Sequence, residues 1–249
     1  MRKYLIGTIT CLVGVFAFSS VASAAVTSLN TTVNIRPAKQ KKKVFGPASV
    51  FFASDDTHAG FLPCPPGTGT TDACFAYPPS TQAVLTFSKD IKFTPGNLPD
   101  CNLAAIAGKN TAGARAACPG SIVGTGSNVN KTTSGQTLNG VITAFNGAPS
   151  GGNPSLYLHV DIAGVTTKPI LNGVIRGNVL SVQIPPVPGA VIEHFDTTLS
   201  KKKVGKKKGK NVFYFSARCS KKKWTTTETV TYQTGQQLSD TVTGRCKQT

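Results

Sequence analysis

The chain has 249 residues and carries 27 Lys and Arg against 10 Asp and Glu, a formal net charge of +17 at pH 7. A coiled coil or helical bundle needs Ala, Leu, Glu and Lys at helical spacing, so the near absence of Glu excludes both classes. Apolar residues make up 39% and fall in strand-like runs that can bury enough surface to offset chain entropy, which argues against disorder. The composition predicts a folded, basic, β-rich protein and indicates no particular activity.

The first 24 residues have the organisation of a secretory signal peptide. A basic start, Met1–Tyr4, precedes an apolar run at 5–18, and Ala22-Ser23-Ala24 supplies a small-residue cleavage site. The apolar run is shorter than the roughly 20 residues that a membrane-spanning helix requires. We therefore expect cleavage near Ala24 and a secreted mature chain, 25–249, without a transmembrane anchor. We expect this mature chain to be one β-rich domain, either a single compact unit or two stacked β lobes.

Cysteine usage fits an exported protein. Cleavage removes Cys11, whose neighbour Thr10 already disfavours a lipid anchor, and the six remaining cysteines are even in number. None of them forms a C-x-x-C pair, so neither a zinc site nor thioredoxin-like redox chemistry is indicated. Among fifteen possible connectivities we expect the sequential one, in which each bridge closes a loop of about 10 to 30 residues. The expected bridges are Cys64–Cys74, Cys101–Cys118 and Cys219–Cys246.

Strand signals dominate the first part of the mature chain, as short runs of Val, Ile, Thr, Phe and Tyr with alternating polarity. The expected strands are at 28–36, 47–54 and 82–93. A Pro/Gly-rich loop is expected at 55–80. Two short helices are expected at 103–107 and 111–117. Because Cys101 and Cys118 bracket them, we predict a stapled helical insertion near residues 103–117 on a β scaffold.

The second half is predicted to be almost continuous β structure. The expected strands are at 121–129, 137–145, 155–162, 165–175, 178–184, 190–199, 211–219, 224–234 and 237–246. Gly177-Asn178 is a hairpin signal, and Gly235 separates the last two strands, which makes them another hairpin. Strands at this spacing, with turn residues between them, indicate an all-β fold, and we predict a disulfide-stapled antiparallel β-sandwich.

A set of short strings is spread over residues 98–246. They are Leu98-Pro99-Asp100-Cys101, Lys109-Asn110-Thr111, Val123-Gly124-Thr125-Gly126, Ala144-Phe145-Asn146-Gly147, Leu158-His159-Val160, Ile184-Pro185-Pro186, Ser216-Ala217-Arg218-Cys219 and Gly244-Arg245-Cys246. In this combination the segment resembles a family of uncharacterised secreted, cysteine-containing β-rich proteins of soil actinobacteria. The resemblance implies an exported β-rich domain with disulfides, and it implies no activity and no functional residues.

Three lysine runs are the most prominent local feature. They consist of Lys39 with Lys41, Lys42 and Lys43; Lys201, Lys202, Lys203, Lys206, Lys207, Lys208 and Lys210; and Lys221, Lys222 and Lys223. Two interpretations stay open: solvated loops that protect strand edges, or nonspecific contacts with an anionic polymer. Lys lacks the bidentate fork of Arg, and only Trp224 among the aromatic residues adjoins a run, so sequence-specific nucleic-acid recognition is not expected. A continuous strand at 211–219 would span about 30 Å, which predicts that the second and third runs lie at its opposite ends.

Histidine and aspartate offer a weaker candidate site. His159 and Asp161 are two residues apart on one expected strand, as are His194 and Asp196 on another, so each pair shares a face. If the strands were neighbours, the four side chains could form a metal or acid/base cluster. Alternating polar residues on an outward sheet face produce the same pattern. His58, after Asp55-Asp56, could bind a cation, but ordinary loop solvation is favoured.

The sequence contains no G-x-S-x-G, no H-E-x-x-H and no phosphate-binding loop, and we expect no cofactor. We therefore predict a secreted, non-enzymatic structural or binding module of the extracellular or cell-envelope space, adhering to anionic polymers through its lysine-rich loops. The alternative is a secreted hydrolase or carbohydrate-binding domain that uses Tyr157, His159 and Asp161 on an open sheet face.

Overall fold

The computed structural model describes residues 26–58, 78–132, 135–187 and 189–249. In chain order its elements are β1 Val26–Arg36, β2 Lys39–Gln40, β3 Gly46–Pro47, β4 Ser49–His58, β5 Ser80–Phe87, β6 Ile91–Phe93, α1 Leu103–Ile106, α2 Thr111–Ala117, a 3-10 turn Pro119–Ser121, β7 Ile122–Thr132, β8 Thr137–Ser150, β9 Asn153–Ile162, β10 Ile170–Arg176, β11 Val179–Gln183, β12 Ala190–Leu199, β13 Lys203–Lys207, β14 Lys210–Phe213, β15 Phe215–Ala217, β16 Lys223–Tyr232, β17 Gln237–Arg245 and β18 Lys247–Gln248. The predicted all-β class is confirmed, and α1 and α2 form the predicted helical insertion.

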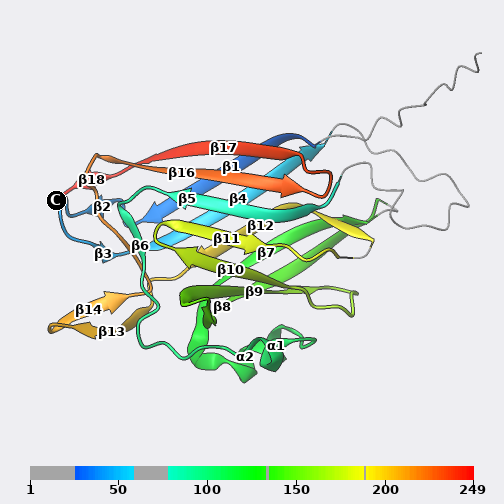
Figure 1. Ribbon diagram of the computed structural model, residues 1–249, viewed down its shortest axis with the longest axis horizontal. Coiled ribbons are helices and arrows are strands. Elements are labelled where there is room, and N and C mark those ends of the chain that lie inside the picture. Colours follow the sequence, from blue (N-terminus) through cyan, green and yellow to red (C-terminus); the bar gives the residue numbers. More distant parts are fainter. Residues whose placement is uncertain (1–25, 59–77, 133–134, 188) are drawn as a thin grey trace, which may run out of the picture.

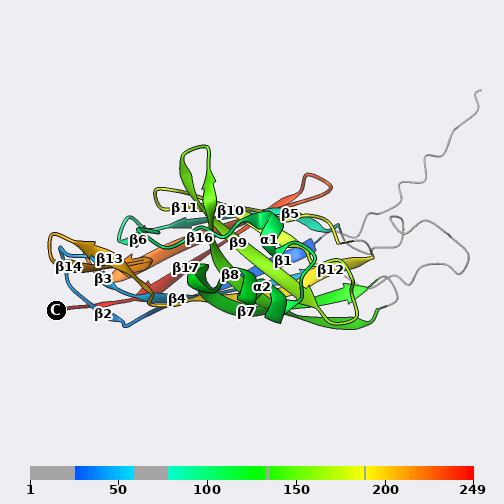
Figure 2. The same ribbon diagram turned by 90° about the horizontal axis from the view of Figure 1, so that it is seen from below.

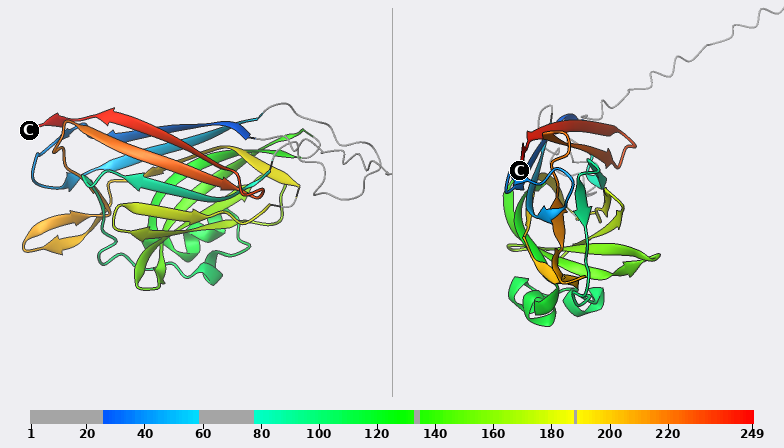
Figure 3. Two further views of the ribbon diagram at one scale, coloured as in Figure 1. Left: turned by 45° about the horizontal axis from the view of Figure 1, so that its top comes forward. Right: turned by 90° about the vertical axis from the view of Figure 1, so that its left-hand side faces the viewer.

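One large sheet contains eleven of these strands, in the order β1-β4-β12-β7-β8-β9-β10-β11-β5-β16-β17. Every neighbouring pair in it is antiparallel. The sheet curls until its edge strands β1 and β17 lie side by side, which makes it nearly closed and barrel-like (Figures 1 and 3). The predicted β-sandwich would consist of two separate sheets. Here the hydrogen-bonded strands form one sheet that is continuous from β1 to β17. Alternating polarity marks one buried face on each strand, and both arrangements need that pattern.

The strand β16 illustrates how sequence sets the two faces. Its inward positions are buried, and its outward positions after Lys223 are threonines that are partly exposed, as period-two alternation requires. Threonine is favoured on a half-exposed sheet surface because it is β-branched. The inward residues are Trp224, Thr226, Glu228, Val230 and Tyr232. An acidic side chain therefore faces the interior of the curled sheet.

Side chains, not a backbone ladder, close the seam between β1 and β17. Asp240 accepts the backbone N–H of Thr31 through Oδ2 at 2.7 Å, and Gln236 donates from Nε2 to the Val26 carbonyl at 2.9 Å. Beyond the other end of this seam, β2 and β18 pair in parallel, with Lys39 opposite Lys247. The seam is thus held at both ends, and the sheet needs no further strand to close.

The main hydrophobic core fills the inner face of the curled sheet. Phe87 and Phe93 meet edge to face with ring centroids 5.5 Å apart, and Phe93 meets Phe215 at 5.2 Å. Leu85 and Phe87 are buried while Thr86 between them is exposed, as the alternation at 82–93 predicts. Burial of such aliphatic and aromatic side chains supplies most of the favourable free energy of folding.

Two of the predicted disulfides are present, Cys101–Cys118 and Cys219–Cys246. The first brackets α1 and α2, which lie against β8 and β9 outside the sheet (Figure 2). Cys64 and Cys74 lie outside the described residues, so their pairing stays a prediction. Among the described residues, no helix combines the length and the apolar character needed to cross a bilayer.

Candidate functional site

The three lysine runs gather at one end of the molecule. The loop after β2, the hairpin of β13 and β14, and the start of β16 all lie at the left of Figure 1, and Figure 3 gives the same arrangement from two other directions. The prediction of one continuous strand at 211–219 is wrong. The strand is interrupted at Tyr214: β14 pairs with β13, whereas β15 pairs with β3 and β6.

The disulfide Cys219–Cys246 organises the first and third runs. Cys219 donates its backbone N–H to the carbonyl of Lys41 at 2.9 Å, and Cys246 donates its own to the carbonyl of Lys222 at 3.0 Å. Both half-cystines are buried. Each half of one covalent bridge therefore fixes the backbone of a different lysine run.

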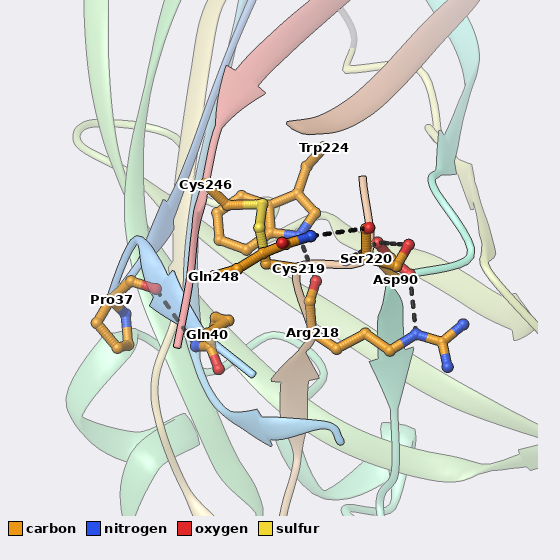
Figure 4. Close-up of a disulfide and its surroundings, with 9 residues drawn as sticks. All are labelled: Pro37, Gln40, Asp90, Arg218, Cys219, Ser220, Trp224, Cys246 and Gln248. Atoms are coloured by element: carbon orange, nitrogen blue, oxygen red, sulfur yellow. Dashed lines mark hydrogen bonds and ion pairs between the residues drawn. A yellow bond between two sulfur atoms is a disulfide. The ribbon is translucent and has the colours of Figure 1, made fainter. Parts of the chain in front are cut away.

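A buried aspartate lies beside this bridge (Figure 4). Asp90 accepts from Arg218 Nε at 2.8 Å, and its other oxygen accepts from the backbone N and Oγ of Ser220 at 2.8 and 2.6 Å. Trp224 Nε1 donates to the Arg218 carbonyl at 2.7 Å, and Gln248 Nε2 donates to the Ser220 carbonyl at 2.9 Å. Burial raises the pKa of Asp90, but the bonds from Ser220 and Arg218 outweigh that effect and lower it overall. This network holds the residues on both sides of Cys219 in place.

Two lysines occupy a backbone conformation that L-residues with a Cβ avoid. Lys208 has φ 49° and Lys222 has φ 60°, and no other non-glycine residue of the described ranges has a positive φ. Lys208 and Gly209 form the two-residue turn between β13 and β14, where Asn-Gly is preferred. A left-handed conformation at such a residue costs about 1 kcal/mol. Both strained positions carry a positive charge at the lysine-rich end.

The predicted binding lysines are not equivalent. Lys202 donates from Nζ to the carbonyls of Gly120 and Ile122 at 2.7 and 2.6 Å, and burial lowers its pKa. Lys201 lies 5.9 Å over the ring of Phe213. No lysine of the three runs forms a salt bridge with an acid in the part of the chain that the structure describes. Lys202 thus has a structural contact, while the exposed members Lys41, Lys42, Lys43, Lys203, Lys206, Lys207, Lys208, Lys210, Lys221, Lys222 and Lys223 project into solvent.

The predicted open face around His159 is instead covered by the helical insertion. His159 is fully buried, and its Nε2 lies 2.8 Å from the carbonyl of Lys109, to which it donates. Burial lowers the pKa of this imidazole, which favours the neutral form. Tyr157 is also buried, packed in the small core beneath α1 and α2. The expectation of an open sheet face there is therefore wrong, because the segment between Cys101 and Cys118 occupies it.

Asp161 anchors the same insertion. Its Oδ1 lies 2.6 Å from Lys168 Nζ, and its Oδ2 accepts from the backbone N and Oγ1 of Thr111 at 2.7 and 2.9 Å. The bond with Lys168, with those from Thr111, lowers the pKa of Asp161 to about 2. Thr111 is the first residue of α2, so the carboxylate also complements the positive end of that helix. Asp161 is a structural residue in this setting.

His194 and Asp196 lie on another part of the outer face. His194 contacts Asp55 at 2.6 Å and Asp196 at 3.4 Å, and although burial lowers its pKa, these carboxylates raise it overall. The strands β7 and β8 separate β12 from β9, so Asp196 and Asp161 are about 14 Å apart. The hypothetical cluster of His159, Asp161, His194 and Asp196 does not assemble. Among the described residues, no group of three or more His, Cys, Asp or Glu is arranged to hold a metal ion, and the side chain of His58 lies outside them.

A second feature was missed by sequence reasoning, a mostly apolar cavity inside the curled sheet whose lining includes the acids Asp56, Glu193 and Glu228. Thr31 Oγ1 donates to Glu228 at 2.8 Å, and the Tyr232 hydroxyl donates to Asp56 at 2.9 Å. Burial raises the pKa of Asp56 to about 6 and that of Glu228 to about 7. The available signal was Glu228 itself, a lone acid on the apolar face of an alternating strand.

Comparison of the chain with protein-family models, with curated proteins and with solved structures finds no match. The resemblance to secreted actinobacterial proteins accordingly stays a prediction. The lysine-rich end and the interior cavity are the features of this structure that bear on its function.

Proposed function

We propose that this chain is a secreted, non-enzymatic binding module that adheres to anionic polymers of the extracellular or cell-envelope space through its lysine-rich end. The signal-peptide pattern at residues 1–24 supports export. The two disulfides also support it, because such bridges persist in oxidising compartments.

The observation that carries this proposal is the joint attachment of two lysine runs to one disulfide. Loops that only solvate the protein do not require a fixed backbone conformation. Here the backbone carbonyls of Lys41 and Lys222 each accept a hydrogen bond from the backbone N–H of a buried half-cystine. The hairpin of β13 and β14 adds the second run at the same end of the molecule (Figure 1). Lysines on a fixed backbone bind a polyanion with less loss of backbone conformational entropy than lysines on mobile loops.

The chemistry of lysine defines the kind of partner. An ammonium is a compact point charge that does not select a planar bidentate group, so binding depends on the charge density of the polymer more than on its sequence. Neutralising several phosphates or sulfates releases their counterions, and the affinity then falls steeply as salt rises. The expected partner is a linear polymer with closely spaced phosphate, sulfate or carboxylate groups.

Retention of the mature chain on immobilised heparin in a NaCl gradient tests the proposal. We expect Lys221→Ser/Lys223→Ser to elute at clearly lower NaCl than the wild type. The matched control is Lys109→Ser/Lys131→Ser, which removes the same charge outside the runs and should shift elution little. Equal shifts for the two variants would show that only net charge matters, and the absence of retention at low salt would overturn the proposal.

A further inference from the structure

The interior of the curled sheet contains a cavity that no part of the proposed polymer binding uses. The cavity has a volume of about 70 Å³ and is partly open to solvent. Side chains from strands around the sheet line it, and most of them are apolar: Val50, Phe52, Leu180, Val182, Phe195 and Leu199 are examples. A mostly apolar lining with a few polar groups is typical of ligand sites in proteins.

Half of the polar residues that line this cavity are acids, namely Asp56, Glu193 and Glu228. Glu228 is 1% exposed and projects from β16, and Asp56 projects from β4. The whole sequence has only 10 Asp and Glu against 27 Lys and Arg, so three of these few acids line the interior of a strongly basic protein. Acids whose only role is to make the chain soluble lie on the surface, because burying a carboxylate without a cationic partner costs free energy of folding.

No basic side chain of the described residues pairs with the carboxylate of Glu228 or of Asp56. Their hydrogen bonds come from hydroxyl groups, Thr31 to Glu228 and Tyr232 to Asp56. Ser54 also donates to Glu228, and the charged groups acting on the pair are Asp55 and Asp240, which are acids as well. The electrostatic environment of this end of the cavity is therefore negative, and it contains no cation to balance it.

We propose that the cavity binds a small amine with an apolar body, whose ammonium group lies against Glu228 and Asp56 while the body fills the apolar part. An ammonium supplies three hydrogen-bond donors and the missing positive charge. An anionic ligand would meet two carboxylates, and a neutral apolar ligand would leave them unpaired. The cavity thus selects for charge at one end and for apolar surface along the rest.

The proposal implies a defined pH dependence. The ammonium needs a deprotonated partner, and burial raises the pKa of Asp56 to about 6 and that of Glu228 to about 7. Amine affinity is therefore expected to rise as pH increases through this range, with the pair binding a proton in competition with the ligand. Asp55, Asp240 and Tyr232 face the same pair and are expected to shift the midpoint without reversing its direction.

Titration of the full mature chain with hexylamine, hexanol and hexanoate at pH 8 tests the proposal, using calorimetry and amide shifts in NMR spectra. The three probes share one apolar chain and differ in the charge of the head group. We expect hexylamine to bind at least about tenfold more tightly than the other two, the factor for a charge-assisted hydrogen bond. We expect the shifted amides to include Leu180, Val182 and Thr31. Equal affinity for the three probes, tighter hexanoate binding, or no hexylamine binding would each overturn the proposal.

A variant then assigns the head-group site. Glu228→Gln keeps the size of the side chain and removes its charge, so we expect it to lose the preference for hexylamine and to keep the affinity for hexanol. Asp196→Asn removes an acid from the outer face and should keep the full preference. If Glu228→Gln bound hexylamine as tightly as the wild type does, the assignment would be wrong. The wild-type series decides the proposal even if the variant does not fold.

Discussion

Cys219 donates its backbone N–H to the carbonyl of Lys41, 178 residues earlier in the chain, at 2.9 Å. Its disulfide partner Cys246 makes the equivalent bond to Lys222. Through these two bonds, segments that are far apart in sequence present their lysines from one rigid base. The lysine-rich end is therefore a product of tertiary structure as much as of composition.

Asp90→Asn should weaken both stability and polymer binding. The change removes the ion pair with the partly exposed Arg218 and weakens the hydrogen bonds that Ser220 donates to the buried carboxylate, which we expect to cost about 2 kcal/mol of unfolding free energy. Urea unfolding measures that loss. On net charge alone, removing an acid would strengthen heparin retention, so elution at lower NaCl than the wild type would support the structural role. Elution at higher NaCl would contradict it.

Lys208→Asn should stabilise the hairpin of β13 and β14. Asn tolerates the left-handed conformation at this turn better than Lys does, and we expect a gain of up to about 1 kcal/mol. Slower amide exchange in β13 and β14 would report the gain. Lys206→Asn removes the same charge from a position with ordinary backbone geometry, and it should bring no such protection. Equal protection in both variants would rule out backbone strain at Lys208.

Asp161→Asn should loosen the helical insertion without unfolding the sheet. The variant loses the ion pair with Lys168 and weakens the bonds from Thr111, at a cost of about 1 to 3 kcal/mol. Faster amide exchange confined to residues 103–117 is the expected result. Because the pKa of Asp161 is lowered to about 2, its contribution is present above pH 3.8 and is lost as pH falls through 2. Asp55→Asn, at an exposed side chain, is the control, and exchange that rose equally in both variants would contradict this role.

Glu228→Gln should change how stability depends on pH. The pKa of Glu228 is raised from 4.5 to about 7, so the protonated form stabilises the fold below pH 4.5, and this contribution is lost as pH rises to 7. At pH 8 the neutral glutamine should raise the unfolding free energy by the order of 2 to 3 kcal/mol. Thermal unfolding from pH 4 to pH 8 would show a shallower decline for the variant. An unchanged pH profile would mean that Glu228 is not buried in its charged form.

Local sequence patterns were sufficient for much of the fold. The alternation in β5 identified its buried face, Gly177-Asn178 marked the hairpin between β10 and β11, and the spacing of Cys101 and Cys118 identified the stapled insertion. Each of these features depends on residues close together in the chain. The curling of the sheet was not predictable in this way, because it depends on contacts such as Thr31 with Asp240, which join opposite ends of the sequence.

The same limit explains the errors at the candidate sites. The pairs His159 with Asp161 and His194 with Asp196 do share faces, but strand order, which places β7 and β8 between them, is a tertiary property. The interruption at Tyr214 redirected the chain and brought the second lysine run to the end that carries the other two. Glu228 was detectable in principle, since an acid among inward-facing apolar residues is unusual.

Heparin retention of two cysteine variants tests most directly whether polymer binding depends on the bridge at the lysine-rich end. Cys219→Ser/Cys246→Ser and Cys101→Ser/Cys118→Ser each remove one disulfide and leave the net charge unchanged. If the bridge between Cys219 and Cys246 organises the binding surface, the first variant elutes at lower NaCl than the wild type, while the second elutes with the wild type. Identical elution of both folded variants with the wild type would contradict this account.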